Sequence, residues 1–162
     1  MQIENVTPGD IPQILELNQV SQPHLSSLTL ERLIELVEMT FHFRVIKENG
    51  EIAAFLMGME EEQSYDSMNY AWISDRYDSF YYIDRIAVAE KYQRQGLGLA
   101  LYNDGQKIAI EIKKPIMACE VNVKPMNQGS ILFHKNFGFE PVGEQDTEGG
   151  KKRVQYMIKD FL

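Results

Sequence analysis

Apolar side chains recur with helical spacing in two segments near the start of the chain, residues 8–20 and residues 28–39. Pro8 and Asp10 give the first segment the start signals of a helix, and Thr29 is available as a cap for the second. A polar break that contains a proline separates the two segments. The pattern therefore predicts two consecutive helices.

Two short runs rich in aromatic and aliphatic residues follow, at residues 41–46 and 52–59. The Asn49-Gly50 pair between them is typical of a tight hairpin turn, so the pattern predicts two antiparallel strands. Residues 60–79 then mix acidic and aromatic side chains without a clean period, over a length that is unusual for a connection. We expect a functional loop or a short helix there.

The rest of the pattern predicts a βαβ unit followed by a helix and a hairpin. The predicted elements are a strand at residues 80–89, a helix at 97–112, a strand at 116–123, a helix from Asn127 to about residue 136, and strands at 139–145 and 154–161. Gly138 is placed to end the last helix, and the Gly149-Gly150 turn joins the last two strands. A βαβ unit implies parallel strands and a right-handed crossover, so we expect a mixed α/β protein.

Length and composition indicate one globular domain. The chain has 162 residues, of which 44% are hydrophobic and 25% charged, as in ordinary folded proteins. Cys119 is the only cysteine, so an intrachain disulfide and a cysteine-based metal cluster are both excluded. We expect no metal site and a reducing environment.

The charge and hydropathy of the chain limit its expected cellular location and the classes of partner that it can bind. Glu4, Asp10 and Glu16 interrupt the apolar positions of the first twenty residues, unlike a secretory signal, and no stretch of transmembrane length follows. We therefore expect a cytoplasmic protein with no membrane partner. The formal net charge of -8 disfavours nucleic-acid binding, which needs clustered Lys and Arg. That charge favours solubility, or else draws cationic partners such as amines.

A glycine-bearing turn, Gln93-Arg94-Gln95-Gly96-Leu97-Gly98, leads directly into the helix predicted at residues 97–112. The N–H groups at a helix N-terminus converge on one spot and the helix dipole adds positive potential, so a phosphate or pyrophosphate binds well there. Glycines also let the backbone approach the anion closely. A plain tight turn is the alternative, and the sequence shows neither a P-loop nor a dinucleotide-binding fingerprint.

Several short motifs taken together resemble the GNAT superfamily of N-acetyltransferases. They are Ile83-Asp84-Arg85-Ile86-Ala87-Val88, the run from Tyr92 to Gly98, Glu120-Val121-Asn122, Asn127, and Phe137-Gly138-Phe139. Gln93, Gly96 and Gly98 meet the Q/R-x-x-G-x-G/A element of the family. The motifs cover about half of the chain, and the predicted order of elements agrees with the family over nearly all of it.

The resemblance implies an α/β (α+β) fold with a mixed, twisted central sheet whose parallel central strands splay apart, flanked by about four helices. Residues 1–162 would form a single domain. The implied activity is that of an acetyl-CoA-dependent N-acyltransferase, which moves an acetyl group to a primary amine of a small molecule or a peptide. A non-catalytic acyl-CoA-binding or sensing module on the same fold is the alternative. A homodimer is common in the family.

The resemblance also assigns the cofactor contacts. The pyrophosphate of coenzyme A would lie on the backbone of Gln93, Arg94, Gln95, Gly96, Leu97 and Gly98. The pantetheine arm would pair with the backbone of Ile86, Ala87 and Val88, in the manner of an added strand. Asn127 would hydrogen-bond near the cofactor.

Glu120 and Asp84 are the candidate bases for amine acetylation, which needs a free amine as nucleophile. Glu120 lies in an apolar strand, where a carboxylate is costly unless it is solvated or paired. It is either a base in a polar cleft or a residue that reaches solvent at the strand end. The resemblance favours a base, acting directly or through a water. Asp84 is the second candidate, and its alternative is a local pairing with Arg85.

His134 stands where many family members have a tyrosine that protonates the departing thiolate. Its imidazole either donates that proton or packs beside the cofactor. Cys119 is predicted on the apolar face of its strand and is interpreted as a core residue. The aromatic and acidic residues between 60 and 80 either wall the acceptor pocket, cover the sheet or form a dimer contact; they are Tyr65, Asp66, Tyr70, Trp72, Asp75, Tyr77, Asp78 and Phe80.

Overall fold

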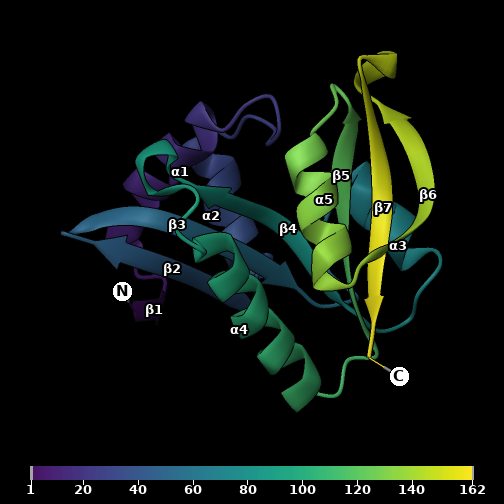
Figure 1. Ribbon diagram of the computed structural model, residues 1–162, viewed down its shortest axis with the longest axis horizontal. Coiled ribbons are helices and arrows are strands. Elements are labelled where there is room, and N and C mark those ends of the chain that lie inside the picture. Colours follow the sequence, from purple (N-terminus) through teal and green to yellow (C-terminus); the bar gives the residue numbers. More distant parts are fainter. Residues whose placement is uncertain (1, 162) are drawn as a thin grey trace. The chain divides into compact units, whose positions relative to one another are not determined.

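The computed structural model describes residues 2–161 (Figure 1). Its helices and strands, in chain order, are β1 (Gln2–Asn5), α1 (Ile11–Val20), α2 (Leu30–Met39), β2 (His42–Glu48), β3 (Glu51–Met59), α3 (Met68–Ser74), β4 (Tyr81–Val88), α4 (Leu97–Glu111), β5 (Ile116–Lys124), α5 (Gln128–Phe137), β6 (Glu140–Thr147) and β7 (Lys152–Asp160). Short 3-10 helices lie at Pro8–Asp10, Glu90–Tyr92 and Glu148–Gly150.

Among the described residues the strands form one seven-stranded sheet in the order β1-β2-β3-β4-β5-β7-β6. β4 and β5 pair in parallel, whereas β1 with β2, β2 with β3, β5 with β7, and β6 with β7 are antiparallel. The sheet is therefore mixed, and the predicted α/β fold class is confirmed.

The helix cap, the hairpin turn and the helix end predicted from local signals are all present in the structure. The Thr29 hydroxyl accepts a hydrogen bond from the Arg32 N–H (3.1 Å) and caps α2. Asn49 and Gly50 have φ of 52° and 78°, as a two-residue hairpin turn requires. Gly138 ends α5 with a φ of 111°. The short strand β1 was not predicted, and the open choice between a loop and a helix at residues 60–79 is resolved by α3.

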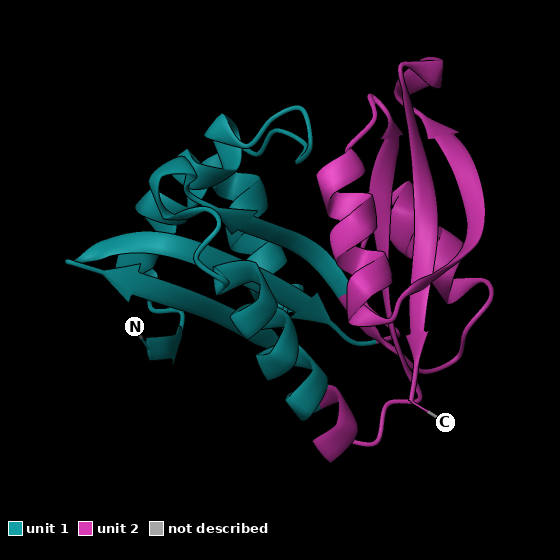
Figure 2. Cartoon of the chain, in the orientation of Figure 1, with its two compact units in different colours: residues 1–60, 83–108 teal, residues 61–82, 109–162 magenta. Residues whose placement is uncertain are grey.

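The described chain separates into two compact units, which Figure 2 shows in different colours. Unit 1 comprises residues 1–60 and 83–108, and unit 2 comprises residues 61–82 and 109–162. β4 begins in unit 2 and ends in unit 1, and α4 begins in unit 1 and ends in unit 2. The single domain expected over residues 1–162 stays a prediction.

Unit 1 is built around the antiparallel strands β1, β2 and β3. Side chains of β2 alternate between two faces, so Phe43 and Val45 are buried on one face while His42 and Arg44 reach Asp104 of α4 from the other. His42 Nε2 and Arg44 Nε lie 3.1 and 2.9 Å from the Asp104 carboxylate. Burial lowers the pKa of His42, and the nearby Asp104 carboxylate partly offsets this effect. The cluster fixes α4 to the strands of unit 1.

Unit 2 is built around β5, β7 and β6, with α5 in front of the strands and α3 behind them in Figure 1. The register places Glu120 of β5 opposite Tyr156 of β7, and Tyr156 opposite Gly143 of β6. These three residues therefore form a row across one face of the sheet. Cys119 points to the opposite face and is buried.

No helix within residues 2–161 has the length and apolar composition needed to cross a membrane.

Candidate active site

The turn at residues 93–98 lies in unit 1, where it follows β4 and includes the first two residues of α4. Arg94 and Gly96 both have positive φ, 63° and 80°, so the backbone is left-handed at both residues. The N–H of Ala100 donates to the carbonyl of Gly96 (3.0 Å), which closes the first turn of the helix. The N–H groups of residues 97–99 precede this bond and have no acceptor inside the helix. They present a helix N-terminus suited to an anion.

The space beside both glycines of this turn is open. A Cβ built at Gly96 or at Gly98 would meet no other atom of the described chain within 4 Å. Gly96 needs its left-handed φ of 80°, but Gly98 is under no such constraint. Packing within the protein therefore gives no reason for a glycine at position 98, whereas close approach of a ligand to the backbone does.

The other cofactor candidates of unit 1 adjoin the turn. The Gln93 side chain donates from Nε2 to the carbonyl of Val88 (3.1 Å) and so holds the turn to the end of β4. Ala87 is buried, and Ile86 and Val88 are half-buried. The structure thus brings the predicted pyrophosphate and pantetheine residues together in one unit. Asn127 lies in unit 2, where its Oδ1 accepts from the Ser130 N–H (3.3 Å) and caps α5.

Asp84 forms the ion pair that was its alternative reading. The Arg85 Nε donates to Asp84 Oδ2 at 3.2 Å, and the Asp84 side chain is only 4% exposed. The Arg85 guanidinium therefore engages one oxygen of the buried Asp84 carboxylate.

Arg85 also fixes the connection between α1 and α2 to β4. Its Nη1 donates to Asn18 Oδ1 (2.9 Å) and to the Ser26 carbonyl (2.7 Å), and its Nη2 donates to Ser26 Oγ (2.8 Å). Asn18 donates from Nδ2 to the same Ser26 carbonyl (3.0 Å). Both Arg85 and Asn18 are buried, so this polar network belongs to the core of unit 1.

Glu120 is half-buried in unit 2 and is hydrogen-bonded by a tyrosine that sequence reasoning did not single out. The Tyr82 hydroxyl donates toward both carboxylate oxygens, at 2.7 Å from Oε1 and 3.0 Å from Oε2. The parallel register pairs Tyr82 with Ala118, two residues before Glu120, so the tyrosine and the glutamate project from the same face. The signal was the side-chain alternation along the two neighbouring parallel strands.

Helix α3 covers this face of unit 2. Tyr70 meets Tyr82 edge-on, with centroids 5.4 Å apart, and Trp72 stacks on Tyr156 at 4.1 Å with an interplanar angle of 8°. The Tyr156 hydroxyl donates to Asn69 Oδ1 (2.7 Å). Burial raises the pKa of Tyr156, and the negative charge of Glu120 raises it further. Aromatic side chains of the segment at residues 60–79 therefore pack around the candidate base.

Gly143 makes the packing of Trp72 possible. A Cβ at Gly143 would lie 2.4 Å from Trp72 Cζ2 and 2.8 Å from Cη2, which is closer than real Cβ contacts. The indole ring therefore lies directly on the backbone of β6.

His134 is buried on α5, and its tautomer follows from its neighbours. Its Nδ1 lies 2.7 Å from the Ser130 carbonyl, which can only accept, so Nδ1 carries the hydrogen and Nε2 of the neutral ring is an acceptor. Burial lowers the pKa of His134, although the hydrogen bond to Ser130 acts in the opposite direction. Donation of a proton from Nε2 requires the imidazolium form, which burial disfavours.

Cys119 is buried beside the site without a catalytic environment. Burial raises the pKa of its thiol, and the Glu120 charge raises it further, so the reactive thiolate is disfavoured. Among residues 2–161, no group of three or more His, Cys, Asp or Glu side chains is arranged to hold a metal ion.

Comparison with known proteins places these features in context. Residues 11–139 match the model of the acetyltransferase (GNAT) family. Ard1 from Thermoplasma volcanium has a TM-score of 0.81 and 20% identity, over 99% of this chain and 97% of that chain. Naa20 from Chaetomium thermophilum, solved with a bisubstrate analogue, has a TM-score of 0.78 and 19% identity, over 99% and 86%.

The ribosomal-protein-S18-alanine N-acetyltransferase from Escherichia coli has a TM-score of 0.75 and 18% identity, over 98% of this chain and 92% of that chain. At these identities the three solved structures show a shared fold. No curated protein matches the sequence.

Proposed function

The chain belongs to the GNAT family of acetyltransferases, and we propose that it transfers the acetyl group of acetyl-CoA to a primary amine of a small molecule or a peptide. The observation that carries the proposal is the turn at residues 93–98, where open backbone N–H groups meet an unfilled space beside Gly98. When bound, acetyl-CoA supplies the activated acetyl group and a thiolate leaving group.

We assign binding of the co-substrate chiefly to backbone groups of unit 1. The N–H groups of residues 97–99 would receive the pyrophosphate, since they have no acceptor inside α4. The backbone of residues 86–88 would pair with the pantetheine arm, and Asn127 is proposed as a further hydrogen-bonding residue for the co-substrate. This division predicts that side-chain substitutions at Gln93, Arg94 or Gln95 weaken binding less than a side chain added at a glycine.

We assign the role of principal base to Glu120, acting directly or through a water. An amine acceptor reaches the enzyme as an ammonium ion, so one proton must pass from its nitrogen to the carboxylate before the nitrogen attacks. Glu120 is half-buried and accepts a hydrogen bond from the neutral Tyr82 hydroxyl, whereas Asp84 is paired with a guanidinium. Asp84 remains the second candidate.

The departing thiolate needs a proton donor. His134 is the family's position for this role, but its Nδ1–H is engaged by Ser130 and its charged form is disfavoured. We propose that His134 packs near the thiol and that a water or another group supplies the proton when the imidazolium is absent.

The acceptor is proposed to meet the segment at residues 61–79. Tyr70 and Trp72 of this segment lie on the same face as Glu120, and its exposed carboxylates, Glu62, Asp66, Asp75 and Asp78, attract a cation. Shortening the exposed part of the segment is expected to change the ranking of acceptors much more than the affinity for acetyl-CoA. An unchanged ranking in a folded variant would limit the segment to covering the sheet.

The test of the proposed function is an acceptor screen. Acetyl-CoA affinity is measured by calorimetry, and release of free thiol is followed across amino acids, diamines, peptide N-termini and lysine peptides. Turnover with an amine, with the acetyl group recovered on its nitrogen, is the expected result. Binding without turnover on any acceptor would favour the non-catalytic acyl-CoA-binding module, and a failure to bind coenzyme A would overturn both.

A further inference from the structure

Tyr82 is the direct hydrogen-bond donor to the candidate base, and its hydroxyl is out of reach of bulk water. The Tyr82 side chain is fully buried, and its hydroxyl lies 2.7 and 3.0 Å from the two carboxylate oxygens of Glu120. One hydroxyl donates only one hydrogen and a carboxylate can accept several, so the hydrogen bond from Tyr82 does not by itself use up the acceptor capacity of Glu120. The geometry thus suits a carboxylate that Tyr82 holds without saturating it.

Backbone pairing and ring packing both fix the position of this hydroxyl. Pairing of Tyr81 with Met117 and of Tyr82 with Ala118 sets the register of the two strands. Tyr70 packs edge-on against Tyr82 at an interplanar angle of 80°, and the Tyr70 hydroxyl in turn accepts from the Gln63 N–H (3.1 Å). The proposed acceptor segment is therefore linked to Glu120 through two tyrosine rings.

We propose that Tyr82 is a positioning residue that holds the Glu120 carboxylate ionised and in one orientation for the acceptor amine. The proposal rests on the function assigned above to Glu120. A donor that hydrogen-bonds a carboxylate favours its charged form, and a hydrogen bond to a charged group is stronger than one between neutral groups. Loss of the hydroxyl alone should make Glu120 easier to protonate and free its carboxylate to rotate.

Other titratable groups around Glu120 belong to the strands and helices packed against β5. Tyr156 of β7 is its register partner and interacts with its charge, and Arg76, which follows α3, acts on the same Tyr156. Cys119 is its neighbour on β5, and α5, which also packs against β5, carries His134. None of these groups is removed when Tyr82 is changed to Phe, so a change in Glu120 can be assigned to the lost hydroxyl.

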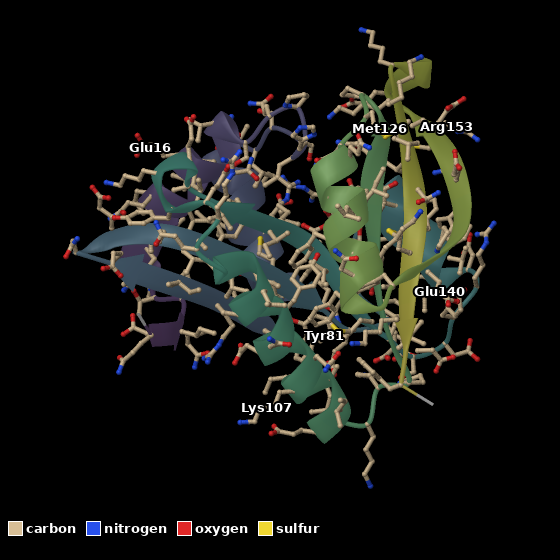
Figure 3. All side chains as sticks on the ribbon, in the orientation of Figure 1. Glu16, Tyr81, Lys107, Met126, Glu140 and Arg153 are labelled. Carbon is tan, nitrogen blue, oxygen red and sulfur yellow. The ribbon has the colours of Figure 1, made fainter. Side chains whose placement is uncertain are left out.

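The experiment is a pH titration of the Glu120 carboxyl carbon by NMR in the full chain without acetyl-CoA. In Tyr82→Phe the midpoint of the Glu120 titration is expected to rise by about one pH unit or more, as the loss of a charge-assisted hydrogen bond implies. The acidic limb of kcat/KM should move in the same direction. The control is Tyr81→Phe, at the buried neighbour labelled in Figure 3, which should leave the Glu120 midpoint in place.

A second substitution controls for a folding defect, and it is expected to shift the Glu120 midpoint in the opposite direction. 3-Fluorotyrosine at position 82 keeps the ring and the hydroxyl but makes the hydroxyl a stronger donor, so the Glu120 midpoint should fall. A midpoint that does not move in either variant would overturn the proposal. If the midpoint moves as expected but Glu120→Gln retains full activity, Tyr82 still controls the ionisation of Glu120, and it is the assignment of Glu120 as base that fails.

Discussion

Unit 1 and unit 2 hold different kinds of candidate chemistry. In unit 1 the turn at residues 93–98 offers backbone N–H groups, while the side chains of Gln93, Arg94 and Gln95 are exposed. In unit 2 the Glu120 carboxylate accepts a hydrogen bond from the Tyr82 hydroxyl. A site made of backbone N–H groups should keep its ligand affinity when neighbouring side chains are exchanged, and lose it when a side chain is added at a glycine. A site built on a carboxylate should lose activity when a single polar atom is removed. The two units must therefore be tested by opposite substitutions, which add a side chain in unit 1 and remove a polar group in unit 2.

The largest effect is expected in unit 2 from Glu120→Gln. Loss of a general base lowers the rate by ~10²- to 10⁴-fold, and acetyl-CoA affinity should stay nearly unchanged. Asp84→Asn should rank next, and Glu140→Gln, an exposed position on β6, is the control. Steady-state kinetics across the pH range and calorimetry provide the measurements.

Two outcomes of this comparison would change the assignment of the base. An inactive Asp84→Asn variant beside a fully active Glu120→Gln variant would move the role of base to Asp84. If both variants stay active, catalysis here consists mainly of placing the amine against the thioester.

The next largest effect is expected on the stability of unit 1, where buried polar side chains form the Arg85 network. Arg85→Ala leaves the partners of a buried cation without their donor, and we expect a loss of about 3 kcal/mol in the free energy of unfolding. Arg32→Ala, which removes an i,i+3 pair with Glu35 on α2, should cost roughly 0.5 kcal/mol or less. Denaturant unfolding measures both, and equal losses would show that burial of the network adds nothing.

The backbone site of unit 1 is tested by a side chain added at a glycine. Gly98→Ala introduces no positive φ and no contact within the described chain, so the fold should persist while acetyl-CoA affinity falls at least about tenfold. Gly96→Val should abolish binding, although its left-handed φ adds about 1–2 kcal/mol of strain.

Gly129→Ala is the matched control, because Gly129 is the second residue of α5 as Gly98 is of α4 and is equally open. Calorimetry of the folded variants gives the affinities. Retained affinity in Gly98→Ala would remove the pyrophosphate from this turn.

The smallest effect is a pH dependence of stability that each unit supplies through one buried histidine. Burial lowers the pKa of both His42 and His134 from the ordinary value of 6.5. Below pH 6.5 the unfolded chain therefore binds more protons than the folded chain, so stability is lost as the pH falls toward the folded pKa values. Each group contributes at most about 1.4 kcal/mol per pH unit.

Substitution of one histidine should remove its contribution to the pH dependence of the free energy of unfolding. In His134→Phe the free energy of unfolding is expected to depend less steeply on pH between pH 7 and pH 5, because the contribution of His134 is lost. His24→Gln, at an exposed position, is the control. A curve as steep as that of the native sequence would show that His134 takes up its proton in the folded state as readily as in the unfolded one.

What the sequence predicted depended on the range of each interaction. The hairpin at Asn49-Gly50, the cap at Thr29 and the end of α5 at Gly138 were predictable, because each signal acts over a few residues. The glycine turn was predictable for the same reason. The short strand β1 was missed because its four residues are mostly exposed and carry no clear alternation.

The surroundings of the candidate bases required the folded chain. Tyr82 lies 38 residues from Glu120 in sequence, and only the register of β4 with β5 brings its hydroxyl to the carboxylate. The pairing of Asp84 with Arg85 was foreseen as an alternative, since the two residues are adjacent. The wider contacts of Arg85 with Asn18 and Ser26 span 67 and 59 residues and left no local signal.

The contact between Gly143 and Trp72 has a consequence for the evolution of the chain. Every other residue at position 143 would place a Cβ too close to the Trp72 indole, so glycine should survive there in any library selected for folding. Larger residues should appear only in clones where Trp72 has become smaller. Co-variation of these two positions would then be a record of steric fit, and a glycine retained on β6 should not be mistaken for a residue that touches substrate.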